Sequence, residues 1–278
     1  MHIDSFFSLS NSDINSAEFV VVGIPYDRSQ SFLPGSRFAP NAIRVASWNL
    51  ESYSSIFDVD LDFLKVCDAG NVNVDGDFSS VIKNVEKFVS DAKGKVLITL
   101  GGEHTVSYAV VRALNEDFCY LVIDAHLDLR DSFDNDPFNH ACTCRRISEL
   151  GLDIVYLGAR SYTKEELEFA KSKGFKIFKP FNLRMEEVED VLTSYDKIYL
   201  SIDVDGFDPS YAPGVSTPEP FGLNPAITLE IFKRFSEKIV AIDLVEVVPD
   251  ENYVTPMLCA RIIFEFLASK SLSSTEKL

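Results

Sequence analysis

The sequence predicts an α/β fold built on a mostly parallel β-sheet. Apolar, β-branched segments alternate with stretches of helical periodicity along almost the whole chain, and this is the order that parallel sheets require, because a helix connects successive strands. Some apolar segments, such as 96–100 and 239–242, are continuous, as expected when helices cover both faces of the sheet. We find no repeat, low-complexity tract or Pro/Ser-rich linker in the 278 residues, and we therefore expect one domain spanning residues 1–278.

The individual elements follow from the two kinds of pattern. Strands are expected at the short segments rich in β-branched and aromatic residues, namely 19–24, 66–68, 96–100, 120–123, 154–157, 176–178, 197–202 and 239–245. Helices are expected between them at 79–92, 105–114, 141–150, 164–173, 186–192, 227–235 and 256–268. The last segment, 269–278, is polar, and we expect it to fray.

The composition argues against several classes of function. The net charge of −17 disfavours binding to nucleic acid or to an anionic membrane, since both need a cationic surface, but it suits a cationic small molecule. The sequence has no apolar run of roughly 18 residues, so no transmembrane helix is expected. Its start lacks the basic and apolar segments of a secretory signal. The five cysteines are scattered and odd in number, which favours a reducing cytoplasm over a disulfide scaffold.

Ionisable side chains follow four of the predicted strands at their carboxyl ends, the edge at which open α/β sheets bind ligands. If the chain stays extended from Asp124 to Asp128, then Asp124, His126 and Asp128 share one face and converge. Together with residues that follow the other strands, the candidate metal ligands are His104, Asp124, His126, Asp128, Asp203 and Asp205.

This ligand set predicts two metal ions. Six ligands, four of them carboxylates, exceed the needs of a structural zinc site, and they suffice for two divalent ions that share carboxylates. Oxygen-rich sites with some imidazole favour Mn²⁺, with Co²⁺, Ni²⁺ and Zn²⁺ as competitors. Two such ions lower the pKa of a bridging water enough to form hydroxide near neutral pH. A single Asp at a strand end is more often a helix cap or turn residue, so the prediction depends on the whole group.

The motifs that contain these residues resemble those of the ureohydrolase family, which includes arginases and agmatinases. They read GGEH at 101–104, DAHLD at 124–128 and SIDVDGFDP at 201–209, in this order. Further matching segments at 23–27, 34–40, 212–214, 217–220 and 243–247 extend the resemblance over nearly the whole chain. The resemblance implies a three-layer α/β/α arginase-like fold around a parallel sheet of about eight strands, a binuclear manganese site and a homo-oligomer, either a trimer or a hexamer.

The resemblance also implies a role for each matching residue. One ion would be held by His104 and Asp128 and the other by His126 and Asp205, with Asp124 and Asp203 bridging both. Glu246 would bind the substrate guanidinium, and His140 would pass a proton to the leaving amine, although Ala141 follows it where the family usually has glycine. The catalytic candidates are therefore His140, Glu246 and Asp128, and two of them, His140 and Glu246, would also contact the substrate.

The loop 129–139 sets the expected substrate. Arginases carry there a Ser/Thr/Asn-rich segment that grips the α-carboxylate and α-amine of arginine, but this loop reads LRDSFDNDPFN. We therefore expect agmatine, hydrolysed to putrescine and urea by attack of a metal-bridging hydroxide, or its N1-aminopropyl derivative. Three acidic residues of the loop, Asp131, Asp134 and Asp136, either offer charges for a distal amine or form a solvated acidic loop. Arg130 and Arg160 would instead suit guanidinobutyrate or formimidoylglutamate, which carry carboxylates.

Two further classes compete with a ureohydrolase. A single-zinc deacetylase on the related fold would not need His104 and Asp128 for a second ion. A catalytically silent metal-binding subunit usually lacks a ligand or catalytic residue, whereas all eight matching positions are intact here. Cys142 and Cys144 follow His140 closely, and we expect them to pack at the start of a helix rather than to act as nucleophiles.

Overall fold

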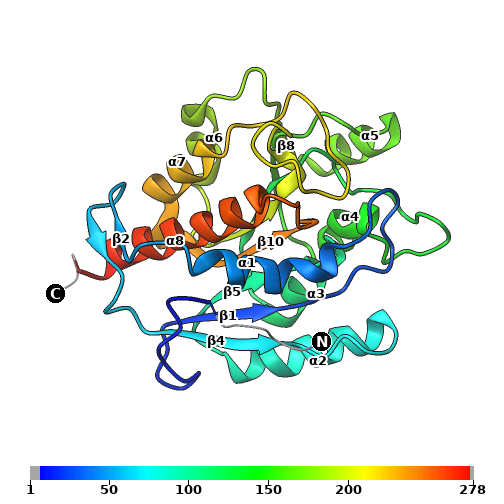
Figure 1. The fold of residues 1–278 in the computed structure, drawn as a ribbon. Helices are drawn as coiled ribbons and strands as arrows, with labels where there is room; N and C mark the ends of the chain where they lie inside the picture. The colour runs from blue at the N-terminus through cyan, green and yellow to red at the C-terminus, as the bar shows by residue number, and fades with distance from the viewer. Residues whose placement is uncertain (1–6, 276–278) are drawn as a thin grey trace.

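The computed structural model describes residues 7–275, and it is built around one eight-stranded sheet whose neighbouring strands are all parallel (Figure 1). The strand order is β4-β1-β5-β10-β9-β6-β7-β8. The bounds are β1 Phe19–Gly23, β4 Val66–Asn71, β5 Val96–Leu100, β6 Cys119–Ile123, β7 Ile154–Leu157, β8 Lys176–Phe178, β9 Ile198–Asp203 and β10 Ile239–Val245. The predicted α/β fold with about eight mostly parallel strands is confirmed.

Helices cover both faces of the sheet. One layer holds α1 (Ala39–Ser47), α6 (Met185–Leu192), α7 (Ala226–Phe235) and α8 (Val254–Thr275), and the other holds α2 (Phe78–Asp91), α3 (Thr105–Leu114), α4 (Thr143–Ser148) and α5 (Lys164–Lys173). Side chains of a strand alternate between the two layers, so Ile242 and Leu244 of β10 pack on the first layer and Ala241 and Val245 on the second. This is the three-layer α/β/α arrangement.

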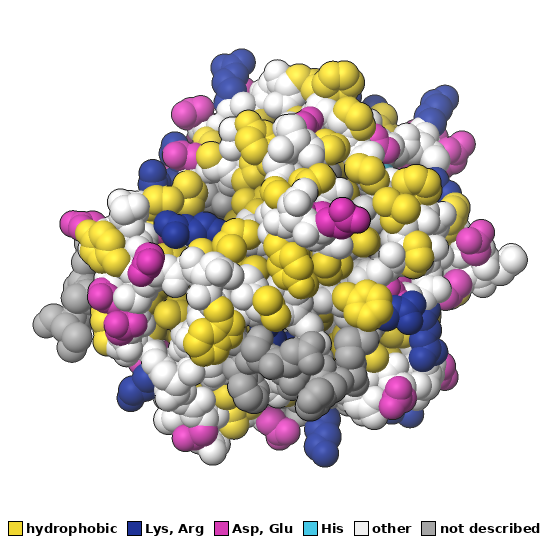
Figure 2. Space-filling model, in the orientation of Figure 1, with side chains coloured by type: hydrophobic (Ala, Val, Ile, Leu, Met, Phe, Trp, Pro, Cys, Tyr) yellow, Lys and Arg dark blue, Asp and Glu magenta, His cyan; other side chains and the backbone are white. Residues whose placement is uncertain are grey.

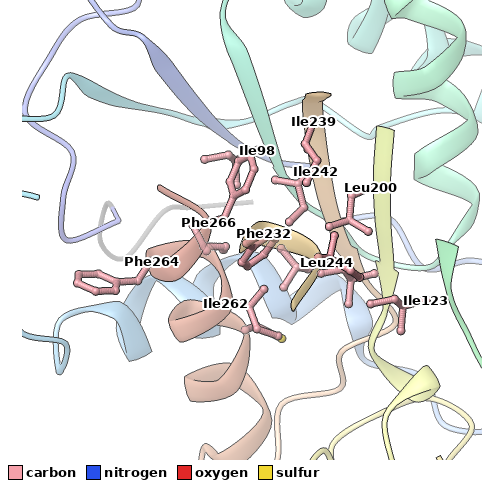
Figure 3. Packing of buried hydrophobic residues seen from close by; sticks show 14 of the residues in the cluster. Ile98, Ile123, Leu200, Phe232, Ile239, Ile242, Leu244, Ile262, Phe264 and Phe266 are labelled. Atoms are coloured by element: carbon pink, nitrogen blue, oxygen red, sulfur yellow. The ribbon is translucent and has the colours of Figure 1, made fainter. Parts of the chain in front are cut away.

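The first layer is rich in aromatic side chains. Phe232 of α7 and Phe266 of α8 lie with ring centroids 5.4 Å apart and pack beside Leu244 and Ile242 of the central strand (Figure 3). All four side chains are fully buried. Because this cluster fixes the position of β10, it also fixes the loop that follows the strand at the carboxyl edge.

The structure contains elements that the sequence did not predict, and it corrects the expectation for the C-terminal segment. Helix α1, which begins with Pro at one of its first positions, and the short antiparallel pair β2 (Tyr53–Ser54) and β3 (Val59–Asp60) were not predicted. The segment after residue 268 does not fray as expected, since α8 continues to Thr275. The hydroxyls of Ser269 and Ser271 are buried and donate to carbonyls within the helix, which explains how a polar segment stays helical. Residues 276–278 lie outside the described part of the chain.

The surface carries charged and apolar side chains side by side (Figure 2). Around α1, Phe38, Val45 and Trp48 are 56%, 41% and 62% exposed. Within residues 7–275, no helix has the length and apolar character needed to cross a membrane.

Candidate active site

The predicted ligands come from neighbouring strands in the middle of the sheet. His104 follows β5 and precedes α3, Asp124 follows β6, and Asp203 is the last residue of β9. Asp205 lies in the 3-10 turn η3 (Val204–Gly206) after β9, and Glu246 follows β10. Because β5, β10, β9 and β6 are consecutive in the sheet, their carboxyl ends deliver these side chains to one place.

The segment from Asp124 to Asp128 is not extended, contrary to the sequence-based prediction. Strand β6 ends at Ile123, and the chain then turns: the backbone N–H of His126 donates to Asp124 Oδ1 at 2.6 Å. Asp128 has a φ of +50°, in the left-handed region. The three side chains converge because the backbone bends between them. Alternation along a strand is not the cause.

The ligand atoms form two groups that share Asp124. In the first group, His104 Nδ1 lies 3.3 Å from Asp124 Oδ2, 2.9 Å from Asp128 Oδ2 and 3.2 Å from Asp203 Oδ2. In the second, His126 Nδ1 lies 3.5 Å from Asp124 Oδ1 and 3.1 Å from Asp205 Oδ2. The two oxygens of Asp124 therefore face opposite groups, as a bridging ligand requires. The other oxygen of Asp203, Oδ1, accepts a hydrogen bond from the backbone N–H of Asp205 at 3.1 Å.

The charges of this cluster suit divalent cations. Burial raises the pKa of Asp128 to about 6, with the charge of Asp124 adding to the effect, and burial also raises the pKa of Asp203. Burial opposes ionisation of Asp124 too, but hydrogen bonds from His104 and His126 hold its pKa below its usual range. Asp124 Oδ2 is buried with His104 Nδ1 at 3.3 Å, but the same nitrogen also lies near Asp128 and Asp203, so three carboxylates share one imidazole donor, which is costly unless a cation completes the group. An oxygen-rich set with one imidazole per group fits Mn²⁺.

A buried polar network holds the ring of His104. Its Nε2 lies 3.2 Å from the hydroxyl of Tyr120 and 3.4 Å from Ser201 Oγ. Ser201 and Tyr199 both donate to the carboxylate of Asp243, at 2.6 and 2.5 Å. Such partners orient a ligating imidazole so that its other nitrogen faces the metal site. The sequence did not predict this network, because its residues lie inside strands among apolar residues and no spacing pattern links them.

Glu246 presents a pre-positioned carboxylate. Its φ is +64°, an uncommon conformation for a residue with a side chain. Its Oε1 accepts from the backbone N–H of His104 at 2.6 Å, and its Oε2 accepts from Gln30 Nε2 at 2.7 Å. A carboxylate oxygen has two lone pairs, so each oxygen keeps one for a further donor. That is the pattern a planar guanidinium needs for two parallel hydrogen bonds.

His140 lines the same cavity as Glu246 and is held by the loop after β1. Its Nδ1 is 3.1 Å from Ser29 Oγ, and its Nε2 is 3.4 Å from Ser31 Oγ. Ser29 also contacts Glu103, a fully buried carboxylate whose pKa burial raises to about 7, with Glu246 adding to the shift. The sequence analysis assigned no role to residues 28–31 or to Glu103. Residues 28–31 lie between two segments already matched to a family, and Glu103 is part of the GGEH motif itself.

These side chains line a cavity of about 420 Å³. Its polar lining includes His126, Asp128, Arg130, His140, Ser161, Thr163, Glu166, Asp203, Asp205, Glu219 and Glu246, and its aromatic lining is Phe133 and Tyr162. Glu166 caps α5 through the backbone N–H of Thr163, and Glu219 Oε1 is 3.7 Å from His126 Nε2. Six carboxylates thus face one guanidinium, that of Arg130.

Of the two interpretations of the acidic loop, the structure favours a solvated loop. Asp131, Asp134 and Asp136 are absent from the cavity lining, and Asp131 is exposed and pairs with Arg146 at 2.8 Å. The carboxylates of the cavity lining other than the expected metal ligands and Glu246 are those of Glu166 and Glu219.

The two arginines considered for a carboxylated substrate behave differently. Arg160 is turned away from the cavity and donates to carbonyl oxygens of residues 158, 205, 206, 207, 219 and 220, so it holds loops together. Arg130 lines the cavity, with its guanidinium 4.4 Å from the centroid of Phe133 and 3.9 Å from Glu166.

The two cysteines near His140 are packing residues by position. Cys142 and Cys144 are fully buried where η2 (His140–Cys142) passes into α4. Burial raises the pKa of Cys142 to about 12 and that of Cys144 well above its ordinary value, which keeps both thiols protonated.

Comparison with known proteins gives one consistent result. Residues 17–269 match the model of the arginase family. The chain is 37% identical to an agmatinase of Pyrococcus horikoshii over 92% of this chain and 93% of that protein. It is 37% identical to an N(1)-aminopropylagmatine ureohydrolase of Thermococcus kodakarensis over 89% of each. The crystal structure of an agmatine ureohydrolase of Thermoplasma volcanium superposes with a TM-score of 0.92 at 36% identity, covering 100% of this chain and 98% of that one.

Proposed function

This chain belongs to the arginase family, and on that premise we propose that it hydrolyses a decarboxylated guanidino compound, agmatine or its N1-aminopropyl derivative, to urea and an amine. The observation that carries the choice of substrate is that, besides the expected metal ligands and Glu246, the cavity lining holds two carboxylates, Glu166 and Glu219, against one arginine. The names of the similar proteins from P. horikoshii and T. kodakarensis support the same two substrates.

The site would hold two Mn²⁺ ions through the residues of its two groups. His104 and Asp128 would hold one ion, His126 and Asp205 the other, and Asp124 and Asp203 would bridge. When bound, such a pair would supply positive charge that lowers the pKa of water and stabilises negative charge on the oxygen that attacks the guanidino carbon. The buried oxygen of Asp124, which shares one imidazole nitrogen with two other carboxylates, supports this assignment.

The protein groups then divide the remaining work. Glu246 would receive the guanidinium on its two free lone pairs and orient the central carbon toward the metal groups. His140, at the cavity wall, would donate a proton to the amine as its C–N bond breaks. Glu219 and Glu166 would attract the cationic tail of the substrate.

One observation favours a second candidate, a guanidino acid such as guanidinobutyrate, or formimidoylglutamate. Arg130 lines the cavity and carries the charge that would pair with a carboxylate. Its guanidinium is already near Glu166 and Phe133, which reduces its capacity to attract an anion, so we rank this candidate second.

A substrate panel with added Mn²⁺ separates the two candidates. We expect kcat/KM for agmatine or its aminopropyl derivative to exceed that for arginine and guanidinobutyrate by at least about tenfold, which corresponds to about 1.4 kcal/mol. Arg130→Ala should leave this preference in place, and Arg184→Ala, which alters an arginine whose side chain is 74% exposed, is the matched control. If a carboxylated substrate is preferred and only Arg130→Ala removes the preference, the diamine proposal is wrong.

We also propose a homo-oligomer in the cytoplasm. The exposed apolar side chains of Phe38, Val45 and Trp48 support burial against another copy. The free, buried state of all five cysteines supports a reducing compartment. Light scattering coupled to size-exclusion chromatography should give a trimer or a hexamer, and a monomer at micromolar concentration would contradict the proposal.

A further inference from the structure

We propose that Glu103, acting through Ser29, is a positioning residue for His140: it fixes the imidazole in the tautomer that carries hydrogen on Nδ1 and leaves Nε2 to exchange the catalytic proton. The role of that proton rests on the proposed function. The tautomer itself follows from the hydrogen bonds alone and is measured without any substrate.

The three residues form a continuous chain of contacts. Ser29 directs two donors at the Glu103 carboxylate, its backbone N–H to Oε2 at 2.7 Å and its hydroxyl to Oε1 at 2.8 Å. The same hydroxyl oxygen accepts from the backbone N–H of His140 at 2.9 Å and lies 3.1 Å from His140 Nδ1. Glu103 is fully buried, so water does not compete for its oxygens.

Counting protons assigns the direction of each bond. A carboxylate only accepts, and a serine hydroxyl has one hydrogen and two lone pairs. The Ser29 hydrogen is used toward Glu103, and one lone pair receives the backbone N–H of His140. The remaining lone pair faces Nδ1, so Nδ1 must be the donor. The hydroxyl is then fully used, and Nε2 holds the lone pair of the neutral ring.

The loop that carries Ser29 is built against the end of β5. A Cβ on Gly102 would lie 1.9 Å from the carbonyl oxygen of Tyr26, so only glycine permits the two segments to approach this closely. The backbone N–H of Glu103 donates to the same carbonyl at 2.8 Å. Asp27 fixes the other side of the loop by accepting from the backbone N–H groups of Gly35 and Arg37.

This arrangement suits a histidine that delivers protons to the cavity. In the imidazolium form both ring nitrogens carry hydrogen, and Nδ1–H stays bonded to Ser29. The Nε2 proton moves to the amine nitrogen as the C–N bond breaks, which returns the ring to the neutral Nδ1–H form, and solvent then restores the proton on Nε2.

Histidine ¹⁵N chemical shifts test the tautomer directly. The full chain is labelled with ¹⁵N-histidine, prepared free of paramagnetic Mn²⁺ and brought to alkaline pH until the histidine signals no longer change. The chain has four histidines, and His140→Ala identifies the signal. We expect Nδ1 of His140 to be protonated and Nε2 not. Protonated Nε2 in the unmodified chain overturns the proposal.

Isosteric variants make the test sharper. In Glu103→Gln, one amide oxygen receives the Ser29 backbone N–H, and the amide nitrogen must donate to the Ser29 hydroxyl. The hydroxyl hydrogen then turns to Nδ1, and the tautomer inverts to Nε2–H. Ser29→Thr keeps the hydroxyl and should keep the Nδ1–H form. Ser31→Ala removes a hydroxyl from the other side of the ring and should also keep it. An unchanged tautomer in both Glu103→Gln and Ser29→Ala would refute the positioning role.

Kinetics separate this inference from the proposed function. Ser29→Ala should lower kcat about tenfold with KM within twofold, because Ser29 touches His140 and not the substrate, and Ser29→Thr should restore kcat. A loss confined to KM or to metal content would contradict the positioning role. If the chain hydrolyses none of the guanidino compounds tested and the tautomer is as expected, the proposed function fails and the positioning role stands.

Discussion

Replacing Glu246 by glutamine removes the charge that should hold the guanidinium and also breaks a balanced pair of hydrogen bonds. The carboxylate accepts from two donors, the His104 backbone N–H at 2.6 Å and Gln30 Nε2 at 2.7 Å. A glutamine side chain has one oxygen and one NH₂ group, so one of these donors must face another donor. The group is almost fully buried, and water has little access to relieve the mismatch.

The size of the effect follows from the lost charge-assisted contact. Removing one partner of a buried, hydrogen-bonded charge pair costs at least about 2 kcal/mol, so kcat/KM for the preferred substrate should fall by about thirtyfold or more. Urea release measured in Glu246→Gln at saturating Mn²⁺, together with its metal content, gives the result. Glu251→Gln makes the same chemical change at an exposed position and is the matched control. A Glu246→Gln enzyme with full metal content and kcat/KM within threefold of the unmodified protein would refute the reasoning.

Other changes have equally definite outcomes. His140→Ala should lower kcat by about 10²–10³ with unchanged metal content, as for a general acid, and loss of metal would show that it is a ligand. Cys142→Ala combined with Cys144→Ala should keep substantial activity, since both thiols are buried and protonated, and complete loss in folded, metal-loaded protein would implicate a thiol. Asp250 accepts from the N–H groups of Val254 and Thr255 at the start of α8, so Asp250→Ala should cost about 1 kcal/mol of unfolding free energy. Burial alone would raise the pKa of Asp250, but these hydrogen bonds outweigh burial and the pKa is lowered. The stabilisation by Asp250 is therefore present above the unfolded pKa of 3.8 and is lost as the pH falls through the lower pKa of the folded state. Denaturant unfolding should therefore show a difference between the two proteins at pH 6 that shrinks toward pH 3, and a difference that grows on acidification would contradict this.

The fold was predictable because its strands are short apolar segments with long helical connections. The segment 96–100 illustrates this, since five consecutive apolar or β-branched residues leave little choice other than a strand buried on both faces. Helix α1 escaped prediction because only one of its seven buried positions, Ile43, carries a large apolar side chain, and the others are alanine, proline, arginine and serine. The end of α8 escaped because serine hydroxyls satisfied inside a helix look polar in sequence.

The candidate site was predictable in its residues but not in its geometry. The ionisable side chains after β5, β6, β9 and β10 are visible in the sequence, and strand order then brings them together. The turn at Asp124 and the left-handed φ of Asp128 depend on hydrogen bonds that a linear pattern does not encode. The same holds for Ser29 and Gln30, which reach His140 and Glu246 only after the chain has folded. The sequence of loop 129–139 did not show whether its acidic residues attract a distal amine, and in the structure they face solvent or basic side chains outside the cavity.

The central claim is that this protein uses two metal ions that share Asp124, and elemental analysis under saturating Mn²⁺ tests it most directly. The unmodified chain should retain two Mn²⁺ ions, because its buried ligand atoms form two groups joined by the two oxygens of one carboxylate. Asp124→Asn should weaken both ions together, whereas Asp205→Asn should weaken mainly the one beside His126. One ion per chain at saturation, or an Asp124→Asn protein that binds both ions as tightly as before, would contradict the account.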